Sequence, residues 1–155
     1  MIGKQSDNNT AVGPCPAGDD KCTNLPKVQR LQEEVKRLAA LVRTDALTGL
    51  YSFRYFYQAL SLEMERTRRS GQPTSLIMLD LDHFKAVNDA FGHEVGNAVL
   101  SHISSLISQT VRRLDIPCRY GGEEFTIILP DTSLEQGVRF ANRLRLIIEN
   151  SPLKT

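Results

Sequence analysis

The chain has 155 residues, a length that suits one ordinary domain with an appendage. Hydrophobic residues make up 41%, charged residues 24%, and the formal net charge is +1, so we expect a globular core and no strong attraction to nucleic acid or a membrane surface. No apolar run is long enough to span a bilayer and residues 1–10 lack the apolar stretch of a secretory signal, which predicts a cytoplasmic protein.

Residues 1–24 are rich in Asn, Asp, Gly, Pro and Thr without a hydrophobic period, and we interpret them as a flexible leader. This segment contains Cys15 and Cys22. The chain has three cysteines, an odd number that does not suit a disulfide framework. A zinc or redox role for Cys15 and Cys22 would need further His or Cys ligands, so free thiols are the favoured interpretation.

Residues 25–44 are predicted to form a helical stalk, with Pro26 in the first turn, where proline is tolerated. Its apolar residues recur at spacings of 3 and 4: Val28, Leu31, Val35, Leu38 and Val42. Valine at each a position and leucine at each d position favours a parallel dimeric coiled coil. The pattern covers only about two heptads, fewer than a firm prediction needs, so a single amphipathic helix packed on its own domain remains the alternative.

A second helix is predicted over residues 53–69, after the break at residues 45–50 and before Gly71. Its apolar face is expected to contain Phe53, Phe56, Tyr57, Leu60 and Met64. Residues 74–82 then form a largely apolar run, which predicts a buried central strand. Asp80 interrupts this run. A buried carboxylate is costly unless it is paired or coordinated, so we favour a metal ligand over a structural salt bridge.

The remaining elements are a helical turn over residues 83–91, a helix from residue 97, a hairpin and a final helix. A capping box at residues 132–135 opens the final helix, whose core side is expected to contain Leu134, Val138, Ala141, Leu144 and Ile148. This order predicts an α/β fold of the α+β sandwich type, with helices covering a largely antiparallel sheet.

The hairpin is expected to turn at Gly121 and Gly122, because primed turns require positive φ angles. Glu123 and Glu124 follow directly. Carboxylates at an exposed bend suit a divalent cation held against a phosphate. The alternative is a polar hairpin tip whose glutamates only face water.

Four segments, in this order and spacing, resemble the GGDEF domains, the diguanylate cyclases of bacterial second-messenger signalling. They read DALTGL at residues 45–50, DLDHFKAVND at 80–89, FGHEVG at 91–96 and GGEEF at 121–125. The resemblance implies a fold like the palm of nucleotidyl cyclases and polymerases. Two GTP-loaded domains would face each other and form cyclic di-GMP with release of pyrophosphate.

The resemblance also implies roles for individual residues. Asp80, Glu123 and Glu124 would be catalytic, with Mg²⁺ or Mn²⁺ held by Asp80, Glu123 and the backbone carbonyl of Leu81. The substrate-binding residues would be Phe84 and Lys85 at the phosphates, Asn88 and Asn97 at the guanine, and Gly121 and Gly122 where the backbone approaches the nucleotide. Arg112 and Asp115 match the family's RxxD site, at which the cyclic di-GMP product inhibits the enzyme.

The sequence departs from the family pattern in two ways. Asn97 stands where the family usually has Asp, and an Asn offers one acceptor oxygen where an Asp offers two. The family normally continues beyond the position of Thr155 with further strands and basic residues, so the domain is expected to be C-terminally short. A catalytically weak nucleotide-sensing module that acts through protein–protein interaction is therefore the alternative function. In either case the helix at residues 25–44 is expected to join a homodimer or to bind a regulatory protein.

Overall fold

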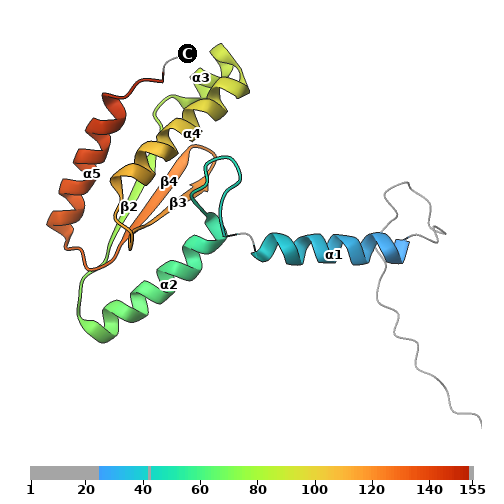
Figure 1. The fold of residues 1–155 in the computed structure, drawn as a ribbon, viewed down its shortest axis with the longest axis horizontal. Helices are drawn as coiled ribbons and strands as arrows, with labels where there is room; N and C mark the ends of the chain where they lie inside the picture. The colour runs from blue at the N-terminus through green and yellow to red at the C-terminus, as the bar shows by residue number, and fades with distance from the viewer. Residues whose placement is uncertain (1–24, 42, 154–155) are drawn as a thin grey trace, which may run out of the picture. The chain divides into compact units, whose positions relative to one another are not determined.

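The computed structural model describes residues 25–41 and 43–153, which fall into two compact units divided after Ala39 (Figure 1). The predicted leader with Cys15 and Cys22, and Val42 of the heptad pattern, lie outside the described residues. Helix α1, Leu25–Leu41, occupies most of the range predicted as a stalk. Leu31 and Val35 on it are 55% and 64% exposed, so these two seam positions are uncovered. Pairing through this seam stays a prediction.

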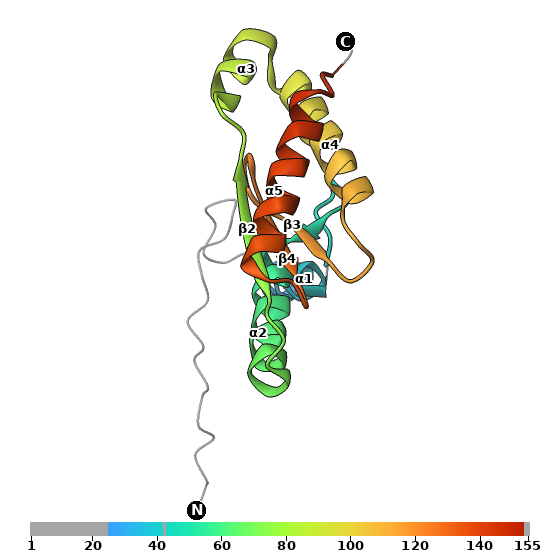
Figure 2. The same ribbon diagram turned by 90° about the vertical axis from the view of Figure 1, so that its left-hand side faces the viewer.

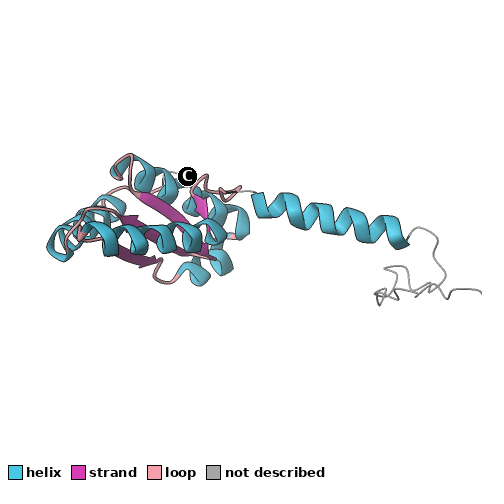
Figure 3. Cartoon of the chain, turned by 90° about the horizontal axis from the view of Figure 1, so that it is seen from below, coloured by secondary structure: helices cyan, strands magenta, loops and turns pink. Residues whose placement is uncertain are grey.

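The second unit contains one four-stranded sheet in the order β1-β3-β4-β2. Its strands are β1 (Tyr51–Ser52), β2 (Ser75–Asp80), β3 (Ile116–Gly121) and β4 (Glu124–Leu129). Its helices are α2 (Phe53–Ser70), α3 (Phe84–Phe91), α4 (His93–Thr110) and α5 (Leu134–Glu149). Strand β4 pairs antiparallel with both β2 and β3, whereas β1 pairs parallel with β3. The strands lie between layers of helix (Figures 2 and 3), which confirms the α+β prediction.

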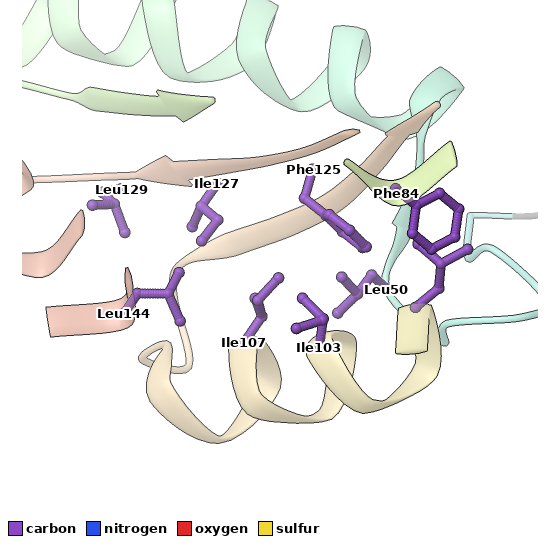
Figure 4. Packing of buried hydrophobic residues seen from close by; sticks show 9 residues of the cluster. Leu50, Phe84, Ile103, Ile107, Phe125, Ile127, Leu129 and Leu144 are labelled. Atoms are coloured by element: carbon purple, nitrogen blue, oxygen red, sulfur yellow. The ribbon is translucent and has the colours of Figure 1, made fainter. Parts of the chain in front are cut away.

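Alternate residues of β4 supply two cores on opposite faces of the sheet. Phe125 and Ile127 pack on one face with Ile107 of α4 and Leu144 of α5 (Figure 4). The buried cluster on the other face is smaller and includes Ile128 of β4 with Phe56 and Ala59 of α2. Because β4 is buried at every position but its first, its place in the sheet is fixed from both sides.

The prediction that residues 74–82 form a buried central strand is wrong. Strand β2 lies at the edge of the described sheet, and its residues alternate between half-buried and exposed. Leu76 is 46% and Met78 is 57% exposed, and Asp80 is exposed as well. A continuous apolar run does not distinguish an edge strand from a central one. Because Asp80 is exposed, the cost of burying a carboxylate no longer argues for a metal ligand at this position. A role for Asp80 must be inferred from the residues that surround it.

The predicted core faces of two helices need correction. On α2, Phe56 and Ala59 are buried, while Phe53, Tyr57 and Met64 are 46%, 50% and 64% exposed. On α5 the buried residues are Gly137 and Leu144, whereas Leu134 and Val138 are 80% and 51% exposed. In both helices a periodic apolar pattern allowed more than one face, and contact with the sheet selected among them.

The start of α5 differs from the predicted capping box by one residue. Ser133 is the N-cap and exchanges hydrogen bonds with Gln136, while the Thr132 hydroxyl donates instead to the carbonyl oxygen of Pro130 at 2.8 Å. Helix α4 also begins earlier than predicted, at His93, because Gly92 both ends α3 and precedes α4. Within the described part of the chain, no helix combines the length and apolar character needed to cross a bilayer.

Candidate functional site

The hairpin between β3 and β4 turns at two residues, Gly122 and Glu123. Gly122 has φ of +40°, a conformation that side chains rarely adopt, so glycine suits it. The tight hairpin is thereby confirmed, but Gly121 belongs to β3 and pairs with Glu124. The register shifts between Arg119 and Gly121, a bulge that re-aims the side chains next to the turn.

The pairing of β2 with β4 places Asp80 directly opposite Glu124. Paired residues on antiparallel strands project to the same face, with Cβ atoms about 4.5–5.5 Å apart. Like charges at such positions are destabilising unless a cation lies between them. Glu123 follows in the turn at the same end of the sheet, half-buried. The fold thus brings three sequence-predicted carboxylates from two separate segments to one end of the sheet.

None of these carboxylates is used inside the described structure. The carboxylate groups of Asp80, Glu123 and Glu124 form no ion pair or hydrogen bond with another described residue, although the backbones of Asp80 and Glu124 pair in the sheet. Among the described residues, no three His, Cys, Asp or Glu side chains lie close enough to hold a metal ion unaided. This donor set fits Mg²⁺, which usually takes one or two carboxylates and completes its shell with water and substrate phosphates.

The segment after β2 forms a sharp corner that leads into α3. His83 has φ of 60°, uncommon for a residue with a side chain, and it caps α3 without a side-chain hydrogen bond. Phe84 is only 8% exposed and packs in the core, and it also lines a cavity together with Asp80 and Leu81. Lys85 is exposed. A helix N-terminus beside a lysine attracts phosphate groups.

The two predicted base-binding residues lie on the helix pair α3 and α4. Asn88 is half-buried, one helical turn after Phe84. Asn97 is exposed on α4, immediately after the buried Gly96. The helices join at Gly92, whose backbone N–H donates to the Asn88 carbonyl oxygen at 2.9 Å.

The predicted product site lies in the loop between α4 and β3. Asp115 is 7% exposed, and its Oδ2 accepts a 2.7 Å hydrogen bond from the backbone N–H of Arg112. The Asp115 backbone N–H donates in return to the Arg112 carbonyl oxygen at 3.1 Å. Part of the Asp115 carboxylate is therefore engaged in an internal turn, while Arg112 is exposed and available to a ligand.

Sequence reasoning missed the residue that connects the hairpin turn to the start of the domain. The Arg119 guanidinium donates to the Gly122 carbonyl oxygen at 2.8 and 3.1 Å and to Asp45 Oδ1 at 3.2 Å. Asp45 also accepts from the backbone and hydroxyl of Thr48 at 2.9 and 2.7 Å. The signal was available in an acidic turn, DALT, and an arginine three residues before the bend, but only folding brings them together.

The environment of Asp45 lowers its pKa from the usual 3.8. Burial alone would raise the pKa, but the hydrogen bonds from Thr48 and the charge of Arg119 outweigh burial. Cys118, in contrast, is fully buried, and burial raises the pKa of its thiol to about 11. This free cysteine is therefore unreactive at neutral pH.

The lowered pKa of Asp45 predicts a pH-dependent contribution to stability. A carboxyl group with a depressed pKa stabilises the folded state above its unfolded pKa and loses this effect as pH falls through the folded value. We expect Asp45→Asn to lower the free energy of unfolding by about 1 kcal/mol at pH 7. Urea unfolding at several pH values should show the difference shrinking below pH 3.8.

Asp131→Asn is the matched control, because Asp131 forms a 2.8 Å ion pair with Arg66 in which both side chains are 47% exposed. Such exposed pairs contribute little. A destabilisation by Asp45→Asn that stays constant down to pH 3 would show that the charge of Asp45 is not involved.

Comparison with known proteins places the chain in a family. Residues 42–155 match the family described as "Diguanylate cyclase, GGDEF domain". The response regulator PleD of Caulobacter vibrioides is 41% identical over 122 residues, which cover 79% of this chain and 27% of PleD. The chain thus spans about a quarter of the length of that curated relative.

Two solved structures extend the likeness to the fold. The coiled coil and GGDEF domain of DgcB from Caulobacter crescentus, in complex with c-di-GMP, superposes with a TM-score of 0.71 at 28% identity, covering 84% of this chain and 68% of that one. The diguanylate cyclase SiaD from Pseudomonas aeruginosa, in complex with its activator SiaC, gives a TM-score of 0.70 at 35% identity, covering 85% and 54%. The hairpin carboxylates, the fold and the sequence match together show that this chain belongs to the GGDEF domain family.

Proposed function

We propose that this chain is the catalytic domain of a diguanylate cyclase, which condenses two GTP molecules into cyclic di-GMP. The observation that supports this most directly is Asp80 facing Glu124, with Glu123 in the adjoining turn and no described cationic partner. Carboxylates left uncompensated at one end of a sheet suit a site that is completed by a metal ion and phosphates.

In the proposed reaction, the 3′ hydroxyl oxygen of one GTP attacks the α-phosphorus of the other. The bond from that phosphorus to the bridging oxygen breaks, and pyrophosphate leaves. Glu123 accepts the hydroxyl proton, and a second such step closes the ring. Asp80, Glu123 and the Leu81 carbonyl oxygen would hold Mg²⁺ or Mn²⁺, which would supply positive charge to stabilise the phosphate oxygens. Lys85 and the N-terminus of α3 hold the outer phosphates.

The proposed chemistry needs two domains, because each one binds a single GTP. Helix α1 leaves Leu31 and Val35 uncovered, and a parallel pair of such helices would raise the effective concentration of one domain near the other. A short coiled coil is marginal alone, which makes it a suitable target for a regulatory protein on residues 25–44. SiaD, a similar protein, was solved with its activator bound.

The alternative proposal, a nucleotide-sensing module without turnover, rests on Asn97 in place of the family's Asp. It predicts GTP binding without product. Incubation with GTP and Mg²⁺, followed by chromatography of the nucleotides, separates the two functions.

We expect Glu123→Gln to reduce cyclic di-GMP synthesis by about a hundredfold or more, because the substitution keeps the size of the side chain but removes its charge and basicity. Product formation should be measured by chromatography, with circular dichroism as a check on folding. Glu135→Gln is the control, since Glu135 is a glutamate on α5 with an 85% exposed side chain. Near-normal synthesis by Glu123→Gln would exclude the proposed role.

We expect Arg112→Ala to relieve inhibition by added cyclic di-GMP while the initial rate stays unchanged. The substitution removes the guanidinium but keeps the backbone N–H that binds Asp115, so the turn should persist. Arg113→Ala, at the neighbouring exposed arginine, is the control. Initial rates should be measured against product concentration, and equal inhibition of all three proteins would eliminate the site.

We expect Leu31→Glu to abolish self-association and to lower synthesis at low protein concentration, with GTP binding to each domain retained. In a parallel pair this substitution would bring two carboxylates together at a d position. Gln29→Glu adds the same charge outside the seam and should behave like the wild type. Light scattering and rate measurements across a dilution series test this, and an unchanged mass and rate for Leu31→Glu would refute pairing through α1.

A further inference from the structure

The carboxamide of Asn88 is a polar group without a partner in the described part of the chain. No hydrogen bond joins it to another described residue, although the residue is half-buried. The carboxamide is not among the fully buried polar atoms that lack a partner, so water or a ligand can reach it. A carboxamide has two N–H donors and one acceptor oxygen to offer a ligand.

The position of this carboxamide depends on a glycine of the neighbouring helix. Gly96 is buried on α4, and a Cβ atom placed there would overlap Asn88 Oδ1. The same Cβ would lie 3.0 Å from Asn88 Cγ and 3.2 Å from Phe84 Cζ. Only a hydrogen atom fits at this point, so the carboxamide lies directly against the backbone of α4.

The ring of Phe84 limits how the chain could respond to a side chain at position 96. Phe84 lies one turn before Asn88 on α3 and is held in the core, so its ring cannot withdraw from Gly96. The Asn88 carboxamide therefore packs against the α4 backbone at Gly96, a position that a larger residue would take from it. A recognition group that is positioned before the ligand arrives loses less entropy on binding.

We propose that Gly96 is a specificity-determining residue, whose missing side chain provides the space that aims the Asn88 carboxamide at the base. This inference rests on the proposed binding of GTP. Guanine presents an acceptor oxygen and N–H donors along one edge, where adenine has a donor amino group. A fixed carboxamide can distinguish these patterns, whereas a freely rotating one can reverse its donor and acceptor and adapt to either.

The experiment compares Gly96→Ala with Gly137→Ala. Both glycines are buried in helices, and a Cβ at Gly137 would also be crowded, at 2.9 Å from Ser75 Oγ. Gly137 lies on α5 near the first residue of β2, whereas the proposed site is at the other end of that strand. Calorimetry should use α,β-methylene GTP and α,β-methylene ATP with Mg²⁺, because the methylene bridge blocks pyrophosphate release.

We expect Gly96→Ala to weaken binding of the GTP analogue about tenfold and that of the ATP analogue much less, so that discrimination falls. Gly137→Ala should lower the melting temperature but keep the wild-type ratio of the two affinities. If Gly96→Ala keeps the wild-type ratio of affinities for the GTP and ATP analogues, the inference about Gly96 is wrong, whereas the proposed function stands. A wild-type protein that binds no GTP analogue would overturn the proposed function and the inference with it.

A thermodynamic cycle covers the case in which Gly96→Ala folds poorly. Asn88→Ala removes the atoms that the new methyl group would meet first, so Gly96→Ala should destabilise the protein much less in that background than in the wild type. If Gly96→Ala destabilises the wild type and the Asn88→Ala variant equally, or prevents both from folding, the space at Gly96 does not serve to accommodate the Asn88 carboxamide.

Discussion

The register of β2 against β4 is the constraint on which the candidate site depends. It places Asp80 opposite Glu124 and thereby brings two segments more than forty residues apart to one point. A slip by one residue would turn every side chain of β2 to the other face. The burial of Phe125 and Ile127 on one side and of Ile128 on the other prevents such a slip in β4. The hydrophobic core thus sets the position of the charges.

Arg119 extends this constraint to the turn and to the beginning of the domain. Its guanidinium donates hydrogen bonds both to the carbonyl oxygen of Gly122 and to the carboxylate of Asp45. Both acceptors belong to irregular segments, which the hydrogen bonds of the sheet do not fix. Asp45 lies shortly after α1 in the chain. The turn that presents Glu123 is therefore tied by hydrogen bonds to the segment that begins the second unit.

The elements were predictable because local signals such as Gly71, Gly92 and the heptad spacing act within a few residues. The errors share a different cause. Whether β2 is an edge or a central strand, and which face of α2 or α5 is buried, depends on contacts between distant segments. The carboxylates of the site were recognised from their motifs, but the Asp80–Glu124 pairing and the Arg119 bridge required the register. Gly96 belongs to the FGHEVG motif, but its contact with Asn88 forms only when α3 packs on α4.

The polar groups of the candidate site fall into two kinds, those hydrogen-bonded within the described structure and those without a partner there. The carboxylates at the hairpin and the carboxamide of Asn88 have no described hydrogen-bonding partner, yet Arg119, Asp45 and Thr48 nearby are bonded to one another. The hydrogen bonds among Arg119, Asp45 and Thr48 stabilise the local backbone. The carboxylates and the Asn88 carboxamide keep their hydrogen-bonding capacity for a ligand under the proposed function. Under the proposed function, a divalent cation held by Asp80 and Glu123 would reduce the like-charge repulsion among the carboxylates at this end of the sheet. The ligand would then stabilise the register that creates its own site, because a molecule that binds only the folded state favours that state.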